Sequence, residues 1–354
     1  GGILMDERKK ILDVKNLDIT FTTSAGPIHA IRGVNFDLYQ GETIAIVGES
    51  GSGKSVSAKA AMGILAGNAV VNCGEVLFNY TNDKGSPEQV DILQQDIDWI
   101  RKNINGKRIA MIFQDPMTSL NPLLPMGEQV DEMIWEHNRD MSKEERQEKV
   151  LELFRLVRIP EPEKRMKSYP HEFSGGMRQR VMIAMALACE PDILIADEPT
   201  TALDVTIQAQ ILELMQELQK KLGMAIIMIT HDLGVIADMC DEIIVMYAGR
   251  ICERGTADEI FYNPKHEYTK GLLRSIPRLD TNHARLIPIA GSPVDLTNMP
   301  KGCAFASRCD QCMKICLTEL PEELDINDDH KASCWMNVKQ VYDEAAQEKE
   351  VEKK

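Results

Sequence analysis

Residues 48–55 read Gly-Glu-Ser-Gly-Ser-Gly-Lys-Ser, and they stand between an apolar run at residues 43–47 and a helix-compatible segment at residues 56–62. A strand, a glycine-rich loop and a helix in this order form the setting that a phosphate-binding loop requires. The glycines allow successive N–H groups to point inward, where the positive end of the new helix also points. A Gly/Ser-rich surface turn is the alternative interpretation, which the complete pattern and both flanks disfavour. The loop therefore predicts binding of a nucleoside triphosphate.

Individual side chains of the loop have separate expected tasks. Lys54 places a point charge beside the β- and γ-phosphates, and Ser55 offers a hydroxyl ligand to Mg²⁺. The remaining expected phosphate contacts come from Gly48, Ser50, Gly51, Ser52 and Gly53.

The chain of 354 residues is acidic, with a formal net charge of −15 and a pI near 5.0. Nucleic acid and anionic lipid are bound by concentrated basic surfaces, so this balance argues against both as main partners. No apolar stretch approaches the length of a membrane span, and the beginning shows no signal-peptide pattern. We therefore expect the protein in the cytosol, or at the cytoplasmic face of a membrane through a partner.

Strands that alternate with helices predict an α/β fold with a mostly parallel sheet. Gln114 lies at a strand-to-loop transition, after the short apolar run at residues 109–113. Two expected buried strands are followed directly by polar side chains: Asp197 and Glu198 after residues 193–196, and His231 after residues 225–230. Ligands bind at the carboxyl ends of such strands, so these side chains should converge on the phosphate loop. His231 by itself would more often be a satisfied polar residue at a strand end.

Two further segments contribute to the expected site. Residues 11–22 and 28–38 predict an antiparallel ribbon ahead of the phosphate loop. Phe21, near its tip, either stacks on the nucleotide base or packs into the core, and the sequence favours neither. Farther along, Ser174-Gly175-Gly176 opens a helix and forms a second anion-binding geometry.

In this order the motifs resemble those of ABC-type ATPases over roughly residues 11–260. The resemblance implies a P-loop core in which a mostly parallel sheet carries an antiparallel β-subdomain and a helical subdomain. It also implies roles for individual residues. Ser55, Gln114 and Asp197 organise Mg²⁺, Glu198 polarises the attacking water, and His231 contacts the γ-phosphate. Ser174, Gly175 and Gly176 complete the site of the opposite subunit in a head-to-tail dimer, and Asp204 lies at the dimer seam.

Other stretches narrow the resemblance. The chain is similar to the D-type ATPase of oligopeptide and dipeptide import systems at several places. These are Met177, where many of these ATPases carry Gln, and residues 178–187, 200–210, 263–270 and 302–309. Such a subunit is an ATP-hydrolysing motor that pairs with a second ATPase beneath two permease subunits, fed by an extracytoplasmic substrate-binding protein. Relatives also move nickel or oligosaccharides, so the cargo stays open. The alternative class is a soluble ABC ATPase of DNA repair or translation, which the single cassette and acidic balance disfavour.

Five of the nine cysteines lie between residues 303 and 334. Their spacing suits an iron–sulfur cluster or a structural zinc site, with free thiols as the third possibility. The resemblance implies a [4Fe–4S] cluster on Cys303, Cys309, Cys316 and Cys334, which leaves Cys312 as an extra cysteine. We therefore expect three regions: an ATPase domain at residues 10–265, a Cys-rich domain at residues 266–337 and a charged, frayed tail at residues 338–354.

Overall fold

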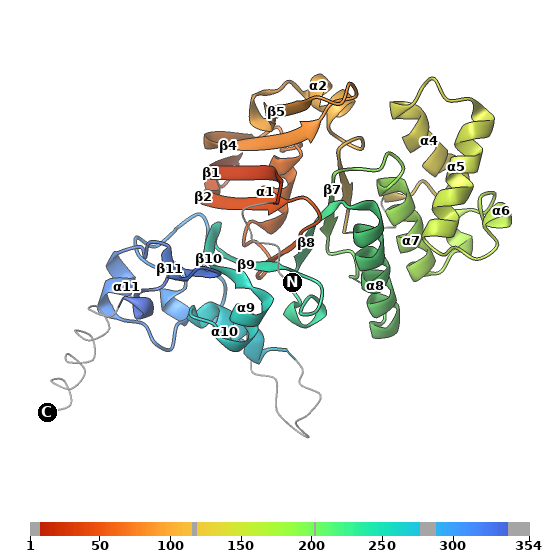
Figure 1. Ribbon diagram of the computed structural model, residues 1–354. Helices are drawn as coiled ribbons and strands as arrows, with labels where there is room; N and C mark the ends of the chain where they lie inside the picture. Colours follow the sequence, from red (N-terminus) through yellow and green to blue (C-terminus); the bar gives the residue numbers. More distant parts are fainter. Residues whose placement is uncertain (1–7, 115–118, 202, 277–287, 339–354) are drawn as a thin grey trace, which may run out of the picture.

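The computed structural model describes residues 8–114, 119–201, 203–276 and 288–338, and two sheets organise them (Figure 1). A four-stranded sheet has the order β2-β1-β4-β5, and an eight-stranded sheet has the order β11-β12-β10-β9-β3-β8-β7-β6. The strands are β1 Lys10–Thr23, β2 Gly26–Tyr39, β3 Thr43–Val47, β4 Ala69–Thr81, β5 Pro87–Asp91, β6 Ile109–Ile112, β7 Ile193–Asp197, β8 Ala225–Thr230, β9 Glu242–Tyr247, β10 Arg250–Thr256, β11 Leu324–Asn327 and β12 His330–Ala332.

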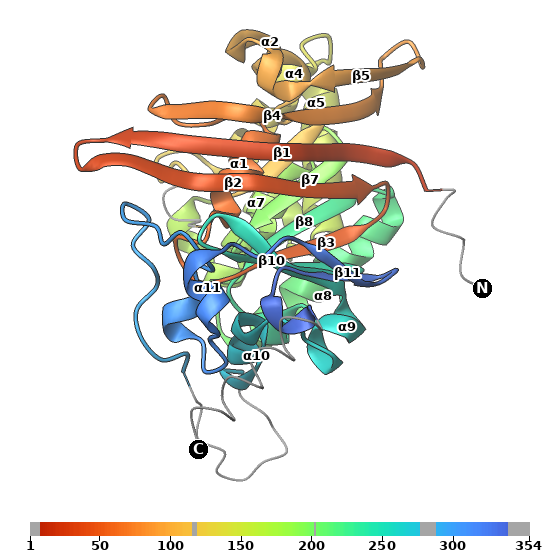
Figure 2. The same ribbon diagram turned by 90° about the vertical axis from the view of Figure 1, so that its left-hand side faces the viewer.

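The helices divide between the phosphate loop, a helical layer and the C-terminal part of the chain. They are α1 Lys54–Ala61, α2 Ile97–Asn103, α4 Met126–His137, α5 Lys143–Leu156, α6 Pro162–Arg165, α7 Gly175–Ala186, α8 Val205–Leu222, α9 Ala257–Tyr262, α10 Glu267–Arg274 and α11 Lys314–Thr318. Figures 1 and 2 show α4 and α5 far from the C-terminal helix α11. Within the described residues, no helix combines the length and apolarity that crossing a membrane demands.

The four-stranded sheet is the expected antiparallel subdomain. Its β1 pairs antiparallel with both β2 and β4, and these long strands cross the front of the molecule in Figure 2. Strand β5, which is exposed and pairs with β4, was not expected from the sequence. Its sequence, Pro-Glu-Gln-Val-Asp, lacks the apolar alternation that identifies a half-buried strand.

The larger sheet is parallel at its centre. The strands β3, β6, β7, β8 and β9 run in one direction, and β10 returns antiparallel beside β9. Alternate side chains of these strands enter two different cores, as the pleat requires. In β3, Ile44 and Ile46 pack with α1 and the four-stranded sheet, whereas Ala45 and Val47 face the helical layer. The strand register sets Val47 opposite Thr230, so the phosphate loop and His231 begin at the same end of the sheet.

The C-terminal segment is joined to this sheet by strand pairing. Strand β12 adds to β10, and β11 adds to β12, both antiparallel. Ala304 and Phe305 also belong to the same apolar cluster as the central strands. The proposed division near residue 265 stays a prediction.

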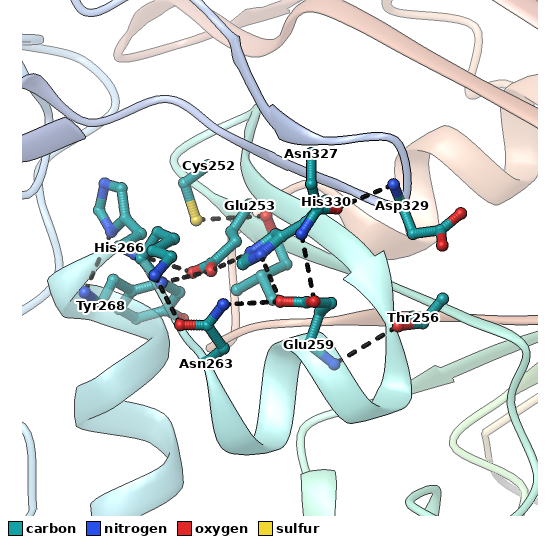
Figure 3. A network of polar contacts seen from close by, with 12 residues as sticks. Cys252, Glu253, Thr256, Glu259, Asn263, His266, Tyr268, Asn327, Asp329 and His330 are labelled. Carbon is teal, nitrogen blue, oxygen red and sulfur yellow. Dashed lines mark hydrogen bonds and ion pairs between the residues drawn. The ribbon is translucent and has the colours of Figure 1, made fainter. Parts of the chain in front are cut away.

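A buried polar network fastens β12 to β10 and α9 (Figure 3). The ring of His330 lies between two carboxylates, with Nε2 2.7 Å from Glu253 and Nδ1 3.1 Å from Glu259. Burial favours a raised pKa for Glu253, but hydrogen bonds from His330 and from the backbone of Lys265 and His266 outweigh it and lower the pKa. The network therefore keeps a buried carboxylate ionised and fully partnered.

We expect His330→Ala to lower the free energy of unfolding by about 3–5 kcal/mol, because it removes the ring that lies 2.7 Å from the buried Glu253 carboxylate. Lys331→Ala is the matched control, since its ion pair with Asp325 is exposed and should contribute under about 1 kcal/mol. Denaturant unfolding of both variants measures the difference. Equal midpoints would show that the network does not stabilise the fold.

Candidate nucleotide-binding site

The phosphate loop, residues 48–55, leaves the end of β3 and runs into α1, as the sequence predicts. Gly48 has φ of +150°, and a Cβ placed there would lie 2.2 Å from the carbonyl oxygen of Met246. A Cβ on Gly53 would lie 3.0 Å from the carbonyl oxygen of Ala30. Both glycines are therefore required because backbone of β9 and β2 approaches the loop closely.

Lys54 is buried beneath the loop and donates hydrogen bonds from Nζ to the carbonyl oxygens of Gly48 at 2.7 Å and Glu49 at 3.0 Å. Burial lowers the pKa of Lys54, while the carboxylates of Glu198, Asp197 and Glu49 act in the opposite direction. The ammonium group is thus placed inside the loop, surrounded by acidic residues.

Ser55 and Asp197 meet at the first turn of α1. The Ser55 hydroxyl donates to Oδ1 of Asp197 at 3.1 Å. Burial raises the pKa of Asp197, and the hydrogen bond from Ser55 opposes that rise. A hydroxyl and a carboxylate are oxygen ligands of the kind that Mg²⁺ takes, so this pair fits the metal expected with ATP.

Glu198 is the point on which the other expected catalytic side chains converge. Its Oε2 accepts from Gln114 Nε2 at 2.9 Å, and its Oε1 lies 3.2 Å from Nδ1 of His231. Its backbone has φ of +48°, which is rare for a residue with a side chain. The amide of Glu198 is fixed by a 2.8 Å hydrogen bond to Ile229, which holds this conformation in place.

One contact of the Glu198 carboxylate, that with Thr201, was not expected from the sequence. The hydroxyl of Thr201 donates to Oε2 of Glu198 at 3.0 Å, so the carboxylate is held by three side chains from three segments. The signal was available, because Thr201 follows the strand that ends in Asp197 by only a short turn. A residue three positions after a candidate base can return to it within one turn of chain.

The remaining expected residues lie in other elements. Ser174 caps α7 by accepting from the amide of Met177 at 3.3 Å, and a Cβ on Gly176 would lie 2.6 Å from Ile207 in α8. Asp204 caps α8 by accepting from the amide of Ile207 at 3.0 Å. Phe21 is half-buried against the core between the two sheets, paired across the ribbon with Ile28. Its contact with a base stays a prediction.

The cysteines of the C-terminal segment gather without forming a preformed ion site. All nine cysteines of the chain are free thiols. Burial raises the pKa of Cys334 to about 12, with smaller contributions from its neighbours Cys303, Cys309 and Cys316. Across the described ranges, no group of three or more His, Cys, Asp or Glu side chains is arranged to hold a metal ion. The structure therefore does not support the expected metal centre, although the donor chemistry suits iron–sulfur or zinc.

Comparisons with known proteins match this geometry. The family model described as "ABC transporter" matches residues 31–201, and the model described as "Oligopeptide/dipeptide transporter, C-terminal region" matches residues 252–316. The dipeptide transport ATP-binding protein DppD of Bacillus subtilis is 53% identical over 329 residues, which cover 93% of this chain and 95% of that protein. The oligopeptide transport ATP-binding protein OppD of Salmonella typhimurium is 51% identical, covering 88% and 90%.

Solved structures agree with the fold. A dimeric ATP-binding cassette in a post-hydrolysis state, bound to ADP and Pi, is 29% identical with a TM-score of 0.59, covering 70% of this chain and 99% of that one. The dimeric structure of a bacterial ABC transporter cassette is 30% identical with the same TM-score and coverage.

Fold and site together define an ATPase of the ABC class. The chain belongs to the ABC transporter family, in its group of oligopeptide and dipeptide transport ATP-binding proteins. The alternative class, a soluble ABC ATPase of DNA repair or translation, is not favoured, because the relatives at this identity are transport subunits.

Proposed function

We propose that the chain is the ATP-hydrolysing motor of an importer for oligopeptides or dipeptides, working at the cytoplasmic face of the membrane. The observation that carries this proposal is the convergence of Gln114, His231 and Thr201 on Glu198, one residue from the Ser55–Asp197 pair. Phosphoryl transfer needs positioning, charge neutralisation and one group that orients water, and these residues can provide all three.

Each residue has a proposed task in the reaction. The amides of residues 50–55 and Lys54 hold the phosphates of ATP, and Glu198 orients the attacking water and accepts its proton. His231 and Gln114 hold the Glu198 carboxylate, and His231 would contact the γ-phosphate. Ser55, Gln114 and Asp197 would hold Mg²⁺, which supplies charge neutralisation at the β- and γ-phosphates.

We propose that a second ATPase completes the site. Ser174 and Gly175 are exposed at the start of α7, where the positive end of a helix can face the phosphates bound by another subunit. Asp204 would lie at the seam between the two subunits. The dimeric cassettes among the solved structures support this arrangement.

A hollow of about 510 Å³ is the proposed contact with a permease. It lies beside β6 and α7, and Phe113 and Met133 expose large apolar surfaces there. Methionine side chains adapt to a partner, and five of them line the hollow: Met62, Met111, Met133, Met182 and Met185. Since Gln114 follows Phe113 directly, a permease segment seated here would be coupled to the nucleotide site.

Co-purification of the tagged chain from native membranes in mild detergent tests these assignments. We expect mass spectrometry to identify a second ATPase, two multi-spanning permeases and a substrate-binding protein that identifies the cargo. A soluble complex without membrane subunits would contradict the importer.

We further propose that the C-terminal segment, residues 266–337, is a small domain that holds a [4Fe–4S] cluster, with zinc as the alternative. The electrostatic influence of Cys303, Cys309 and Cys316 on the Cys334 thiol supports it, because four thiolates are the ligands that such a cluster takes. We expect the cluster to have a structural role, because a small domain gains stability from a bound metal.

Iron content and visible absorbance after anaerobic purification test the cluster. Cys334→Ser should abolish both signals, whereas Cys73→Ser, an exposed cysteine of β4, should leave them unchanged. Cys312→Ser separates the ligand sets, since an extra cysteine can be lost without loss of iron. Wild-type protein without iron would reject the cluster, and zinc in its place would establish the alternative.

A further inference from the structure

The second residue of the phosphate loop, Glu49, is held from outside by the C-terminal segment. Its carboxylate receives two parallel hydrogen bonds from Arg308, with NH1 2.6 Å from Oε2 and NH2 3.0 Å from Oε1. The side chain of Arg308 is only 3% exposed. A two-pronged contact of this kind constrains both position and orientation of the carboxylate.

Arg308 is itself held rigidly. Its Nε donates to the carbonyl oxygen of Ala290 at 3.0 Å, and NH1 also donates to the hydroxyl of Tyr247 at 3.3 Å. Its guanidinium packs beside the ring of Phe305, 5.7 Å from the ring centroid. These contacts fix the guanidinium before it meets Glu49, so little conformational freedom is lost in the pairing.

The backbone of Glu49 is held by the same part of the chain. Its N–H donates to the hydroxyl of Tyr268 at 2.7 Å, so this amide points away from the concave side of the loop. Tyr268 is fully buried and packs against Tyr247 and Phe305. Side chain and amide of Glu49 are thus both anchored by residues beyond position 265.

The inner side of Glu49 faces the phosphate-binding groups. Its carbonyl oxygen accepts from Nζ of Lys54 at 3.0 Å and from the amide of Ser52 at 3.2 Å. Glu49 therefore connects two sets of contacts. Arg308 and Tyr268 bind it from outside the loop, and its carbonyl oxygen binds Lys54 and the amide of Ser52 inside the loop. Three of the eight loop residues are glycine, so a loop without such an anchor would lose more entropy on binding.

We propose that Arg308 is a positioning residue of the nucleotide site, by which the Cys-rich segment holds the phosphate loop in its ATP-binding shape. The inference rests on the proposed assignment of residues 48–55 as the ATP site. It predicts that the segment sets the affinity for ATP without touching the nucleotide. Because the loop contacts the phosphates in ground state and transition state alike, loss of the anchor should raise KM and leave kcat nearly unchanged.

The test compares ATP binding and hydrolysis by the full chain in its assembled transporter. We expect Arg308→Gln to raise the dissociation constant and KM for ATP about tenfold with kcat within about twofold. Arg308→Lys keeps the positive charge but cannot make the two parallel hydrogen bonds, so its affinity for ATP should lie between those of Arg308→Gln and the wild type. Glu49→Gln should resemble Arg308→Gln, and the double variant should be no worse than either single variant, because both remove one interaction.

Arg254→Gln is the matched control for loss of stability. Arg254 also makes a two-pronged contact, with Glu242 in β9, but on another part of the sheet. It should lower the melting temperature while ATP affinity stays at the wild-type value. Arg308→Gln with wild-type affinity, or with a fall in kcat alone, would overturn the proposal. Lys54→Ala with undiminished ATP binding would instead overturn the ATP site itself.

Discussion

Glu198→Gln should reduce ATP turnover by about 10²–10⁴-fold while ATP affinity stays close to that of the wild type. The substitution removes the charge that orients and deprotonates water. It preserves an oxygen that can accept from Gln114 and Thr201, so the shape of the site is retained. Phosphate release by the assembled transporter and equilibrium ATP binding together measure the two effects.

Glu190→Gln is the matched control for this experiment. Glu190 is exposed and pairs with Lys149, away from the phosphate loop. The same chemical change there should leave both turnover and affinity unchanged. Wild-type turnover by Glu198→Gln would refute the assignment of Glu198 as the water-orienting carboxylate.

Gly48→Ala should reduce ATP affinity about a hundredfold, the second large effect. The new Cβ would lie 2.2 Å from the carbonyl oxygen of Met246 and 2.9 Å from Oγ of Ser52. Met246 cannot yield, because β9 is paired on both sides, with β3 and β10. The loop must move instead, and its N–H groups then no longer point toward one position where a phosphate could bind.

Substitutions at two other glycines distinguish the effect of a steric clash on ATP affinity from the effect of backbone strain. Gly51 has φ of +79° and open space around a Cβ, so Gly51→Ala should cost about tenfold in affinity through strain alone. Gly67 also has open space around a Cβ but no positive φ, so Gly67→Ala should bind ATP as the wild type does. Equilibrium titration with ATP ranks the three variants. A Gly48→Ala protein that binds as tightly as Gly67→Ala would disprove the steric requirement.

Much of the core could be predicted from sequence because its signals are local. The capping box at Ser142 and the start of the helix at Asp204 both appear where the residue types place them. Parallel strands end at one side of a sheet, which explains why Glu198 and His231 could be expected to meet. Their contacts confirm that convergence.

The contacts of the C-terminal segment could not be predicted in the same way. Arg308 and Glu49 are separated by 259 positions, and nothing in either sequence context marks the other as a partner. His330 lies in a strand of three residues, too short to show a period of two. Both interactions depend on tertiary placement, which sequence patterns do not encode locally.

The pairing of β12 with β10 also affects the order in which the protein can be completed. During synthesis β10 emerges more than seventy residues before β12, and until then the outer N–H and C=O groups of β10 have no partner strand. An open row of this kind recruits strands from other chains. In the finished sheet the outermost strand is β11, with only four residues and an exposed Asp325. Strands β12 and β11, made well after β10, therefore cover the edge at which the core could otherwise recruit other chains.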